Sequence, residues 1–439
     1  MSAAQPDVAE LVHDATARID RERLAHICAA VVDLPSPTGD EAPLARWLAD
    51  EMASHDIDAH LQPLDDRQAN AWGRVAGSGD GPTLLLYSPI DTLTTGDPTE
   101  DLPWVGDELA PHMTPGAQRS GDLISGLGAM NPKGHAACVL AATEAITMSG
   151  VSLRGDLLAA FGAGGMPTNS RAEQDGRPER HHPGQGAGCS FLLEQGVWAD
   201  AAVIAKPGWS VAWEEVGLAW CDITVRGTHT YVGARHRLPY RNAIADAARV
   251  VTHLESWFPT YTERHTTGLV APQGIVAAVE AGWFHMAAVT PAQARIRVDL
   301  RTEPGQSPLD ACRELRAELD RFAESEPGLE VEVALAVGVP GSRTDPDHWI
   351  VRRAIDAWET ESGSTHEPVT LTSGATDANI LRNRGIPTVR VGLAKVHLDG
   401  TELDFAAGMN TVSLAGMEQL TRYLVRLAVE VCSSDRSEP

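Results

Sequence analysis

Ionisable residues that could do chemistry follow two apolar segments of the chain. Asp91 ends the stretch TLLLYSPID, and Lys206 follows the run AAVIA. At a strand end, Asp91 is a candidate general base or orienting acid, and a salt bridge with Lys206 or Lys133 is the simpler alternative. Lys206 is a candidate catalytic amine with a lowered pKa, an anchor for a substrate carboxylate, or a purely structural positive charge.

Two further charged residues stand near expected element boundaries. Lys133 lies near a predicted helix start, where an ammonium and free backbone N–H groups together bind anions. A solvated lysine in the first helical turn is the alternative. Glu214, in WEEVGL, is a candidate substrate contact or one of an exposed pair of hinge acids.

Polar residues also gather in two other segments as candidate substrate contacts. The first segment contributes His229, Tyr231, Arg235 and His236. A tyrosine hydroxyl there could donate a hydrogen bond to an oxyanion, and a basic surface is the alternative. The second segment, LTSGATDA, contributes Thr376 and Asp377, as binding residues or as caps of a loop.

The elements that carry Asp91 and Lys206 alternate between strands and helices. TLLLYSPID, GDLLAAFGAGG and ADAAVIAKPG predict buried strands, and NPKGHAACVLAATEAITMSG predicts a helix that Gly150 ends. Such alternation indicates βαβ units. The sequence therefore predicts an α/β class with a mostly parallel sheet sandwiched by helices.

From about residue 216 the pattern becomes that of one-sided antiparallel strands. The order is β-α-β-β-α-β, and the second helix should begin at Ser307, with Asp310 completing a capping box. We therefore expect a ferredoxin-like α+β domain over 216–335, inserted in an α/β domain formed by 1–215 and 336–439. The polar stretch 166–187 predicts a long surface loop.

Composition narrows the classes of partner. Sixty acids against 35 bases give a net charge of −25, which argues against nucleic acid and anionic membrane as partners. The six cysteines are scattered singly and suggest neither a zinc knuckle nor a disulfide framework. The N-terminal stretch up to Leu24 predicts one amphipathic acidic helix and no signal peptide. We expect a cytoplasmic protein.

The order of motifs along nearly the whole chain resembles the aminoacylase, acetylornithine deacetylase and succinyl-diaminopimelate desuccinylase family of di-zinc amidohydrolases. The segments that carry the resemblance are LPSPTGDEAPLARWLADEM, LLLYSPIDTL, GLGAMNPKGH, AAFGAGG, AVIAKPG, VRGTHTYVGARHRLPYRNAI, VDLRTEPGQ and SGATDANILRNRGIP. The resemblance implies a zinc-exopeptidase-like fold with an inserted lid and dimerisation domain, and hence a homodimer.

Carried over residue by residue, the resemblance implies that most metal ligands are replaced. Pro89 stands for the first ligand histidine, Asn131 for the aspartate that bridges the metals, and Lys206 for a later carboxylate ligand. Gly164 and Gly165 stand for the catalytic Glu and its ligand neighbour. The last histidine ligand corresponds to His397 or, by the alternative match, to Ala406. Tyr231 stands where the family has a histidine that reaches across the dimer.

Zinc needs three or four N, O or S ligands at about 2.0–2.3 Å, which proline, glycine and lysine cannot supply. We therefore expect no metal and no cofactor, with Lys206 supplying positive charge opposite Asp91. Asn131 and Lys133 join these two residues as candidate catalytic groups.

Three functions remain open at this point. The first is a metal-independent enzyme acting on a C–N bond, amide or ureido, of a small and carboxylate-bearing molecule. The second is a non-catalytic relative that binds a small anion or acts as a dimeric partner protein. The third is a metal-dependent amidohydrolase with relocated ligands drawn from His112, His135, His229, His236 or His397.

Overall fold

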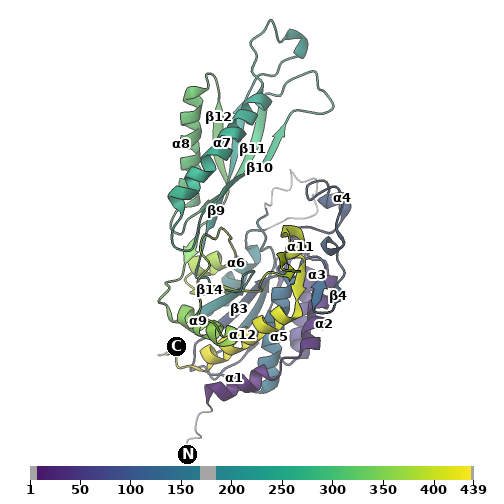
Figure 1. Ribbon diagram of the computed structural model, residues 1–439, viewed down its shortest axis with the longest axis vertical. Helices are drawn as coiled ribbons and strands as arrows, with labels where there is room; N and C mark the ends of the chain where they lie inside the picture. The colour runs from purple at the N-terminus through teal and green to yellow at the C-terminus, as the bar shows by residue number, and fades with distance from the viewer. Residues whose placement is uncertain (1–6, 169–183, 437–439) are drawn as a thin grey trace, which may run out of the picture. The chain divides into compact units, whose positions relative to one another are not determined.

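The computed structural model describes residues 7–168 and 184–436, so most of the loop predicted over 166–187 lies outside the described residues. The chain divides into two compact units (Figure 1). The sheet unit comprises the chain up to Trp213, Thr344–Pro368, and the chain from Thr376 onward. The inserted unit comprises Glu214–Arg343 and the short segment Val369–Ala375.

The sheet unit is built on six strands in the order β1-β2-β6-β3-β7-β14. Their bounds are β1 Asp58–Pro63, β2 Ala69–Val75, β3 Leu84–Pro89, β6 Leu157–Gly162, β7 Ala201–Ala205 and β14 Thr388–Val391. β3 runs parallel to β6 and β7, and β14 parallel to β7, whereas β1 and β2 are antiparallel. Every residue of β3, β6 and β7 is buried, which explains their unbroken apolar runs. The mostly parallel sheet is confirmed.

Helices cover both faces of this sheet (Figure 1). They are α1 Val8–Thr16, α2 Arg21–Asp33, α3 Ala42–Ser54, α5 Lys133–Ser149, α6 Ala187–Glu194, α9 Trp349–Ser362, α10 Ala378–Asn383 and α12 Leu414–Ser433. Leu84 and Leu86 of β3 join one core with α2, α3, α5 and α12. Leu85 and Tyr87 join a second core with α6 and α10. Successive strand residues thus stabilise opposite faces, as the pleat requires.

The N-terminal prediction was wrong in one respect, because the single helix expected there is two helices. α1 ends at Thr16 and α2 begins at Arg21. Asp20 is extended, and its carboxylate accepts hydrogen bonds from the amides of Glu22 and Arg23. An aspartate that caps backbone N–H groups in this way starts a new helix. The helix predicted before Gly150 is confirmed as α5, with Gly150 left-handed at φ 69°.

The inserted unit follows the predicted β-α-β-β-α-β order. Its elements are β9 Gly217–Arg226, α7 Ala243–His265, β10 Gly274–Ala281, β11 Gln293–Thr302, α8 Pro308–Ser325 and β12 Val331–Val339. The sheet order is β10-β11-β9-β12, and all neighbouring pairs are antiparallel. The Ser307 hydroxyl accepts from the Asp310 amide at 3.1 Å, which confirms the predicted cap. This is the ferredoxin-like arrangement.

Short elements complete the described chain. They are α4 Pro98–Asp101, η1 Pro111–Met113, β4 Gln118–Ser120, β5 Leu123–Ser125, β8 Glu214–Glu215, η2 Val232–Ala234, β13 Ser342–Arg343, β15 His397–Leu398, β16 Thr401–Glu402, α11 Phe405–Met409 and β17 Thr411–Ser413. β17 pairs with β5, which brings α11 beside the segment that precedes α5. Among the described residues, no helix has both the length and the apolar character needed to cross a bilayer.

Candidate functional site

Three neighbouring parallel strands deliver their following residues to one edge of the sheet. β3 leads to Asp91, β6 to Gly164 and Gly165, and β7 to Lys206. Parallel strands place their carboxyl ends together, and open α/β sheets bind ligands at that edge. The order of the strands therefore explains why residues far apart in the sequence share one corner of the sheet unit.

Asp91 is fully buried and held by three hydrogen bonds. Oδ2 accepts from the Thr38 hydroxyl at 2.7 Å and from the Met166 amide at 2.8 Å, and Oδ1 accepts from the Gly165 amide at 2.8 Å. Burial raises the pKa of Asp91, and the Thr38 hydroxyl, the Met166 amide and the Lys206 charge oppose that rise. These bonds fix the carboxyl group in position and occupy most of its lone pairs.

Lys206 and Asn131 meet beside this acid. Lys206 is only 6% exposed, and its Nζ donates to Oδ1 of Asn131 at 3.2 Å. The charge of Lys206 also acts on Asp91, since it lowers the pKa of that carboxyl group. The structure thus brings together three of the four residues that the sequence marked as candidate catalytic groups.

Lys133, the fourth, has a different set of contacts. It is fully buried, and its Nζ donates to the backbone carbonyl of Leu34 at 2.6 Å. Burial lowers the pKa of Lys133 to about 7, and the charge of Asp33 opposes that shift. Its position at the start of α5 is as expected, but the ammonium is directed to a structural carbonyl. A catalytic role for Lys133 stays a prediction.

Glu41 is a buried acid that the sequence reading did not single out. Its Oε1 accepts from the Gly39 amide at 3.1 Å, the Gln68 side chain at 3.3 Å and the Gly164 amide at 2.9 Å. Its Oε2 is buried without a hydrogen-bond partner in the described part of the chain. Burial and the nearby charge of Asp91 raise the pKa of Glu41 to about 8. The turn PTGDE was the only sequence signal for this residue.

Tyr87 and Asp377 form another contact that the sequence could not reveal. The Tyr87 hydroxyl donates to Oδ2 of Asp377 at 2.7 Å, although the two residues are 290 positions apart. Burial and the Asp377 charge raise the pKa of Tyr87. A Cβ placed on Gly165 would lie 3.1 Å from Oδ2 of Asp377 and 3.2 Å from Oδ1 of Asp91. Both acids therefore border the same glycine.

Thr376, the residue before Asp377, supports the start of α10. Its hydroxyl accepts from the Ala378 amide at 3.2 Å, as a loop cap does. Asp377 itself is 3% exposed. Assignment of either residue to substrate binding stays a prediction.

The remaining candidate substrate contacts lie in the inserted unit. The exposed residues His229, Tyr231, Arg235 and His236 surround η2. Nδ1 of His229 is 2.8 Å from the Thr290 carbonyl, and the Arg235 guanidinium lies 4.8 Å from the ring centre of Tyr240. These contacts leave the four side chains largely open to solvent, and their role toward a substrate stays a prediction.

Glu214 has a structural role within the same unit. Its carboxylate is 2% exposed, accepts a hydrogen bond from the Leu269 amide and lies 3.8 Å from the Arg343 guanidinium. It therefore holds the turn around Gly268, in contrast to the exposed hinge acid that the sequence allowed. Its assignment to substrate binding stays a prediction.

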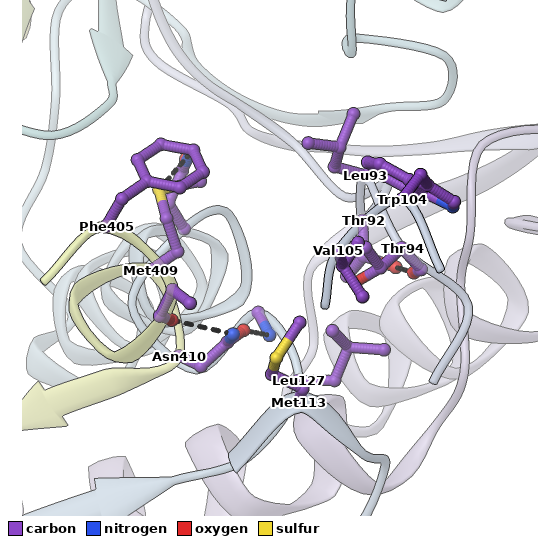
Figure 2. A pocket seen from close by; sticks show the side chains of 13 residues that line it. Thr92, Leu93, Thr94, Trp104, Val105, Met113, Leu127, Phe405, Met409 and Asn410 are labelled. Carbon is purple, nitrogen blue, oxygen red and sulfur yellow. Dashed lines mark hydrogen bonds between the residues drawn. The ribbon is translucent and has the colours of Figure 1, made fainter. Parts of the chain in front are cut away.

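A pocket of about 290 Å³ opens next to Asn131 in the sheet unit. One wall comes from 92–105 and the other from α11 and Asn410, with Met113 and Leu127 between them (Figure 2). Asn410 ties α11 to the segment after Leu127, because its Oδ1 accepts from the Gly128 amide at 2.7 Å and its Nδ2 donates to the Ala406 carbonyl at 2.9 Å. The sequence reading missed this pocket because its walls are about 300 positions apart.

The donor set at this edge does not fit the two zinc ions that the resemblance implies. Pro89, Gly164 and Gly165 carry no ligand atom, and Lys206 presents an ammonium group that repels a dication. The Asn131 amide oxygen already accepts from that ammonium. Ala406 lines the pocket, while the alternative residue, His397, is exposed in β15.

Elsewhere in the described residues, a single group of three side chains has ligand atoms close enough for a metal ion, namely Glu51, His55 and Glu144. Arg23 already forms ion pairs with both of those glutamates. None of the five histidines considered as relocated ligands belongs to this group.

Comparisons with known proteins support the fold. Residues 214–327 match the family described as the peptidase dimerisation domain. A stretch of 175 residues is 27% identical to the succinyl-diaminopimelate desuccinylase of Leptothrix cholodnii, and it covers 39% of this chain and 40% of that protein. The match therefore spans less than half the length of that relative.

Solved structures resemble nearly the whole chain at low identity. The M20 family metallo-carboxypeptidase Sso-CP2 from Sulfolobus solfataricus matches with a TM-score of 0.67 and 14% identity, over 92% of this chain and 98% of that one. The YXEP protein of Bacillus subtilis, described as a dinuclear metal binding peptidase from the M20 family, matches with a TM-score of 0.62 and 16% identity, over 94% and 98%. This chain therefore has the fold of the M20 peptidases, and its residues 214–327 match the peptidase dimerisation domain of that family.

Proposed function

We propose that this protein is an enzyme of the M20 hydrolase fold that acts, without a divalent metal, on a C–N bond of a small carboxylate-bearing molecule. The fold and the desuccinylase relative support an amide or ureido bond as the target. The poor fit between the site residues and zinc supports a mechanism in which the protein's own groups supply the charge.

The observation that carries the proposal is the contact between Lys206 and Asn131 at the border of the pocket. A nearly buried ammonium group is a strong partner for a substrate carboxylate or for a developing oxyanion, because the surroundings screen it little. The Asn131 side chain lines the pocket and lies within 3.2 Å of that ammonium. Asp91 lies close enough for the Lys206 charge to lower the pKa of its carboxyl group, so the two residues interact electrostatically.

In this proposal Asp91 orients Lys206 and does not accept the proton of an attacking water. Its oxygens already accept three hydrogen bonds, and it has no exposed surface. A general base must lie within hydrogen-bond reach of the proton that it removes. The substrate should therefore be more reactive than a peptide, since the several kcal/mol of charge stabilisation that a metal supplies are missing.

Because the oxygens of Asp91 already accept three hydrogen bonds, a second candidate function is also favoured. In it the protein is a non-catalytic relative that binds a small anion. The pocket, the Lys206 ammonium and the Asn131 amide would bind a small anion equally well if no bond were cleaved. The two functions differ in whether any C–N bond is cleaved.

Turnover measurements separate these functions. Purified protein would be treated with EDTA and incubated with a panel of N-acyl and ureido amino acids, with release of amine as the readout. We expect turnover that EDTA leaves unchanged and that Lys206→Ala abolishes. Binding of panel members without turnover would favour the second function, and turnover that zinc restores after chelation would overturn the metal-independent mechanism.

We also propose a homodimer, because residues 214–327 match a dimerisation domain. Sedimentation velocity at micromolar concentration should show a species of twice the 46.8 kDa chain mass. A monomer at all concentrations would contradict this part of the proposal.

A further inference from the structure

Three large apolar side chains are exposed around the pocket beside Asn131. Leu93 is 42% exposed, Trp104 59% and Phe405 75%. Single exposed apolar residues are common on protein surfaces. Their collection at one concave site, from segments about 300 positions apart, is instead typical of a ligand-binding site.

The interior of the pocket continues this apolar character. Met113 and Leu127 are buried between the two walls, and Met409 extends from α11 on the side of Phe405 (Figure 2). Leu93 and Trp104 face them from the opposite wall (Figure 2). Methionine side chains adapt to irregular shapes and make favourable contacts with aromatic rings. The lining therefore suits a flat or branched apolar group.

Polar side chains in the walls are largely engaged with the protein itself. The Thr92 hydroxyl donates to the Thr94 carbonyl at 2.7 Å. The amide group of Asn410 is bonded to Gly128 at one end and to Ala406 at the other. Among the polar side chains of the lining, Asn131 is the one in contact with the Lys206 ammonium. The Asn131 Nδ2 group also contacts Sδ of Met409 at 3.6 Å, so Asn131 links the ammonium to the apolar lining.

We propose that this pocket binds an aryl or branched aliphatic group of a ligand whose carboxylate or carbonyl oxygen faces Asn131 and Lys206. The proposal rests on the proposed function and specifies its substrate class, with Trp104 and Phe405 determining specificity. An apolar cavity of about 150 Å³ is large enough for benzene. The 290 Å³ here therefore leaves room for a ring and a short linker.

Calorimetric titration in the presence of EDTA tests this with four probes. These are acetate, hexanoate, 3-phenylpropanoate and the uncharged 3-phenylpropan-1-ol. We expect 3-phenylpropanoate to bind at least tenfold more tightly than acetate, with hexanoate between them. Phe405→Ser and Trp104→Ser should each reduce that preference at least threefold. Leu398→Ser, which alters a similarly exposed apolar residue outside the pocket, should leave it unchanged.

Equal affinities for acetate and 3-phenylpropanoate, or no binding of any probe, would overturn the inference. The inference would also be overturned if Phe405→Ser and Trp104→Ser both left the preference for 3-phenylpropanoate over acetate unchanged. Suppose that the alcohol bound as tightly as the carboxylate and that Lys206→Met had no effect. The pocket would then still bind an apolar group, as inferred. The proposed function would then lose its charged anchor, so the two failures can be told apart.

Discussion

The ammonium nitrogen of Lys206 lies 3.2 Å from the amide oxygen of Asn131, and the two residues are 75 positions apart. Both positions correspond to metal-ligating carboxylates in the family that the sequence resembles. The contact links a nearly buried positive charge to a residue that lines a pocket. In the proposed function, the fixed Lys206 side chain supplies the positive charge at the site.

Removal of this charge should weaken the binding of anionic ligands. We expect Lys206→Met to lower the affinity for 3-phenylpropanoate at least tenfold, since hydrogen bonds to charged groups contribute about 1.5–3 kcal/mol. Calorimetry with EDTA present measures the effect. Lys395→Met is the matched control, because Lys395 is exposed and pairs with Glu402. Equal losses in the two variants would mean that net charge alone governs binding.

Gly165 should not tolerate a side chain. A Cβ there would lie 2.4 Å from the Cβ of Pro89, which is far below van der Waals contact. We expect Gly165→Ala to lower the free energy of unfolding by about 1–3 kcal/mol, as overpacking does. Urea denaturation measures the change.

Two further variants test that steric explanation for Gly165. Gly416→Ala is the control, since its Cβ would meet no atom closer than 3.9 Å. In a Pro89→Gly background, the cost of Gly165→Ala should shrink, because the clashing atom is absent. An undiminished cost in the double variant would show that another contact is responsible.

Glu41 should make stability fall as pH rises. Its pKa is raised from an ordinary value of 4.5 to about 8, so the native state binds more protons than the unfolded state between these pH values. The free energy of unfolding then decreases with pH in this window, by at most about 1.4 kcal/mol per pH unit. Glu41→Gln removes this titration, and its profile from pH 5 to pH 8 should be flatter than that of the wild type.

Urea denaturation at pH 5, 6.5 and 8 compares these slopes for Glu41. Glu402→Gln, a change at an exposed ion pair, should preserve the wild-type slope. Parallel profiles for wild type and Glu41→Gln would contradict the assignment.

Lys133 should act on stability in the opposite direction and leave binding unaffected. Its pKa is lowered from 10.5 to about 7, so the unfolded state binds more protons between these values. The contribution of Lys133 to the free energy of unfolding therefore increases as pH rises from 7 toward 10.5. Lys133→Met should lack this gain, and should cost about 1–3 kcal/mol at high pH because the Leu34 carbonyl loses its donor.

Two measurements test the structural role of Lys133. Thermal denaturation from pH 6.5 to pH 9.5 should show the missing gain in the variant. Affinity for 3-phenylpropanoate should stay within twofold of the wild type. A tenfold loss, like that expected for Lys206→Met, would contradict a purely structural role for Lys133.

Local patterns in the sequence were sufficient to predict the elements that hold the site. The apolar runs before Asp91 and Lys206 are buried strands, and the parallel arrangement follows from their alternation with helices. The N-terminal helix was the exception, because the capping role of Asp20 was not recognised. Non-local contacts were harder to predict, since nothing in the sequence links Tyr87 to Asp377, and only the turn PTGDE pointed to Glu41.

The sequence by itself determined the order of strands and helices and the presence of an acid and an amine at the ends of two apolar strands, and it predicted that metal-ligating residue types are replaced. Periodicity and residue chemistry are local properties, so they can be read without coordinates. Only the tertiary structure decided that Asp91 has most of its lone pairs occupied, that Lys133 is directed to a backbone carbonyl, and that Trp104 and Phe405 line one pocket. Burial and hydrogen bonding of these groups depend on chain segments up to 300 positions away, whose approach no local pattern encodes.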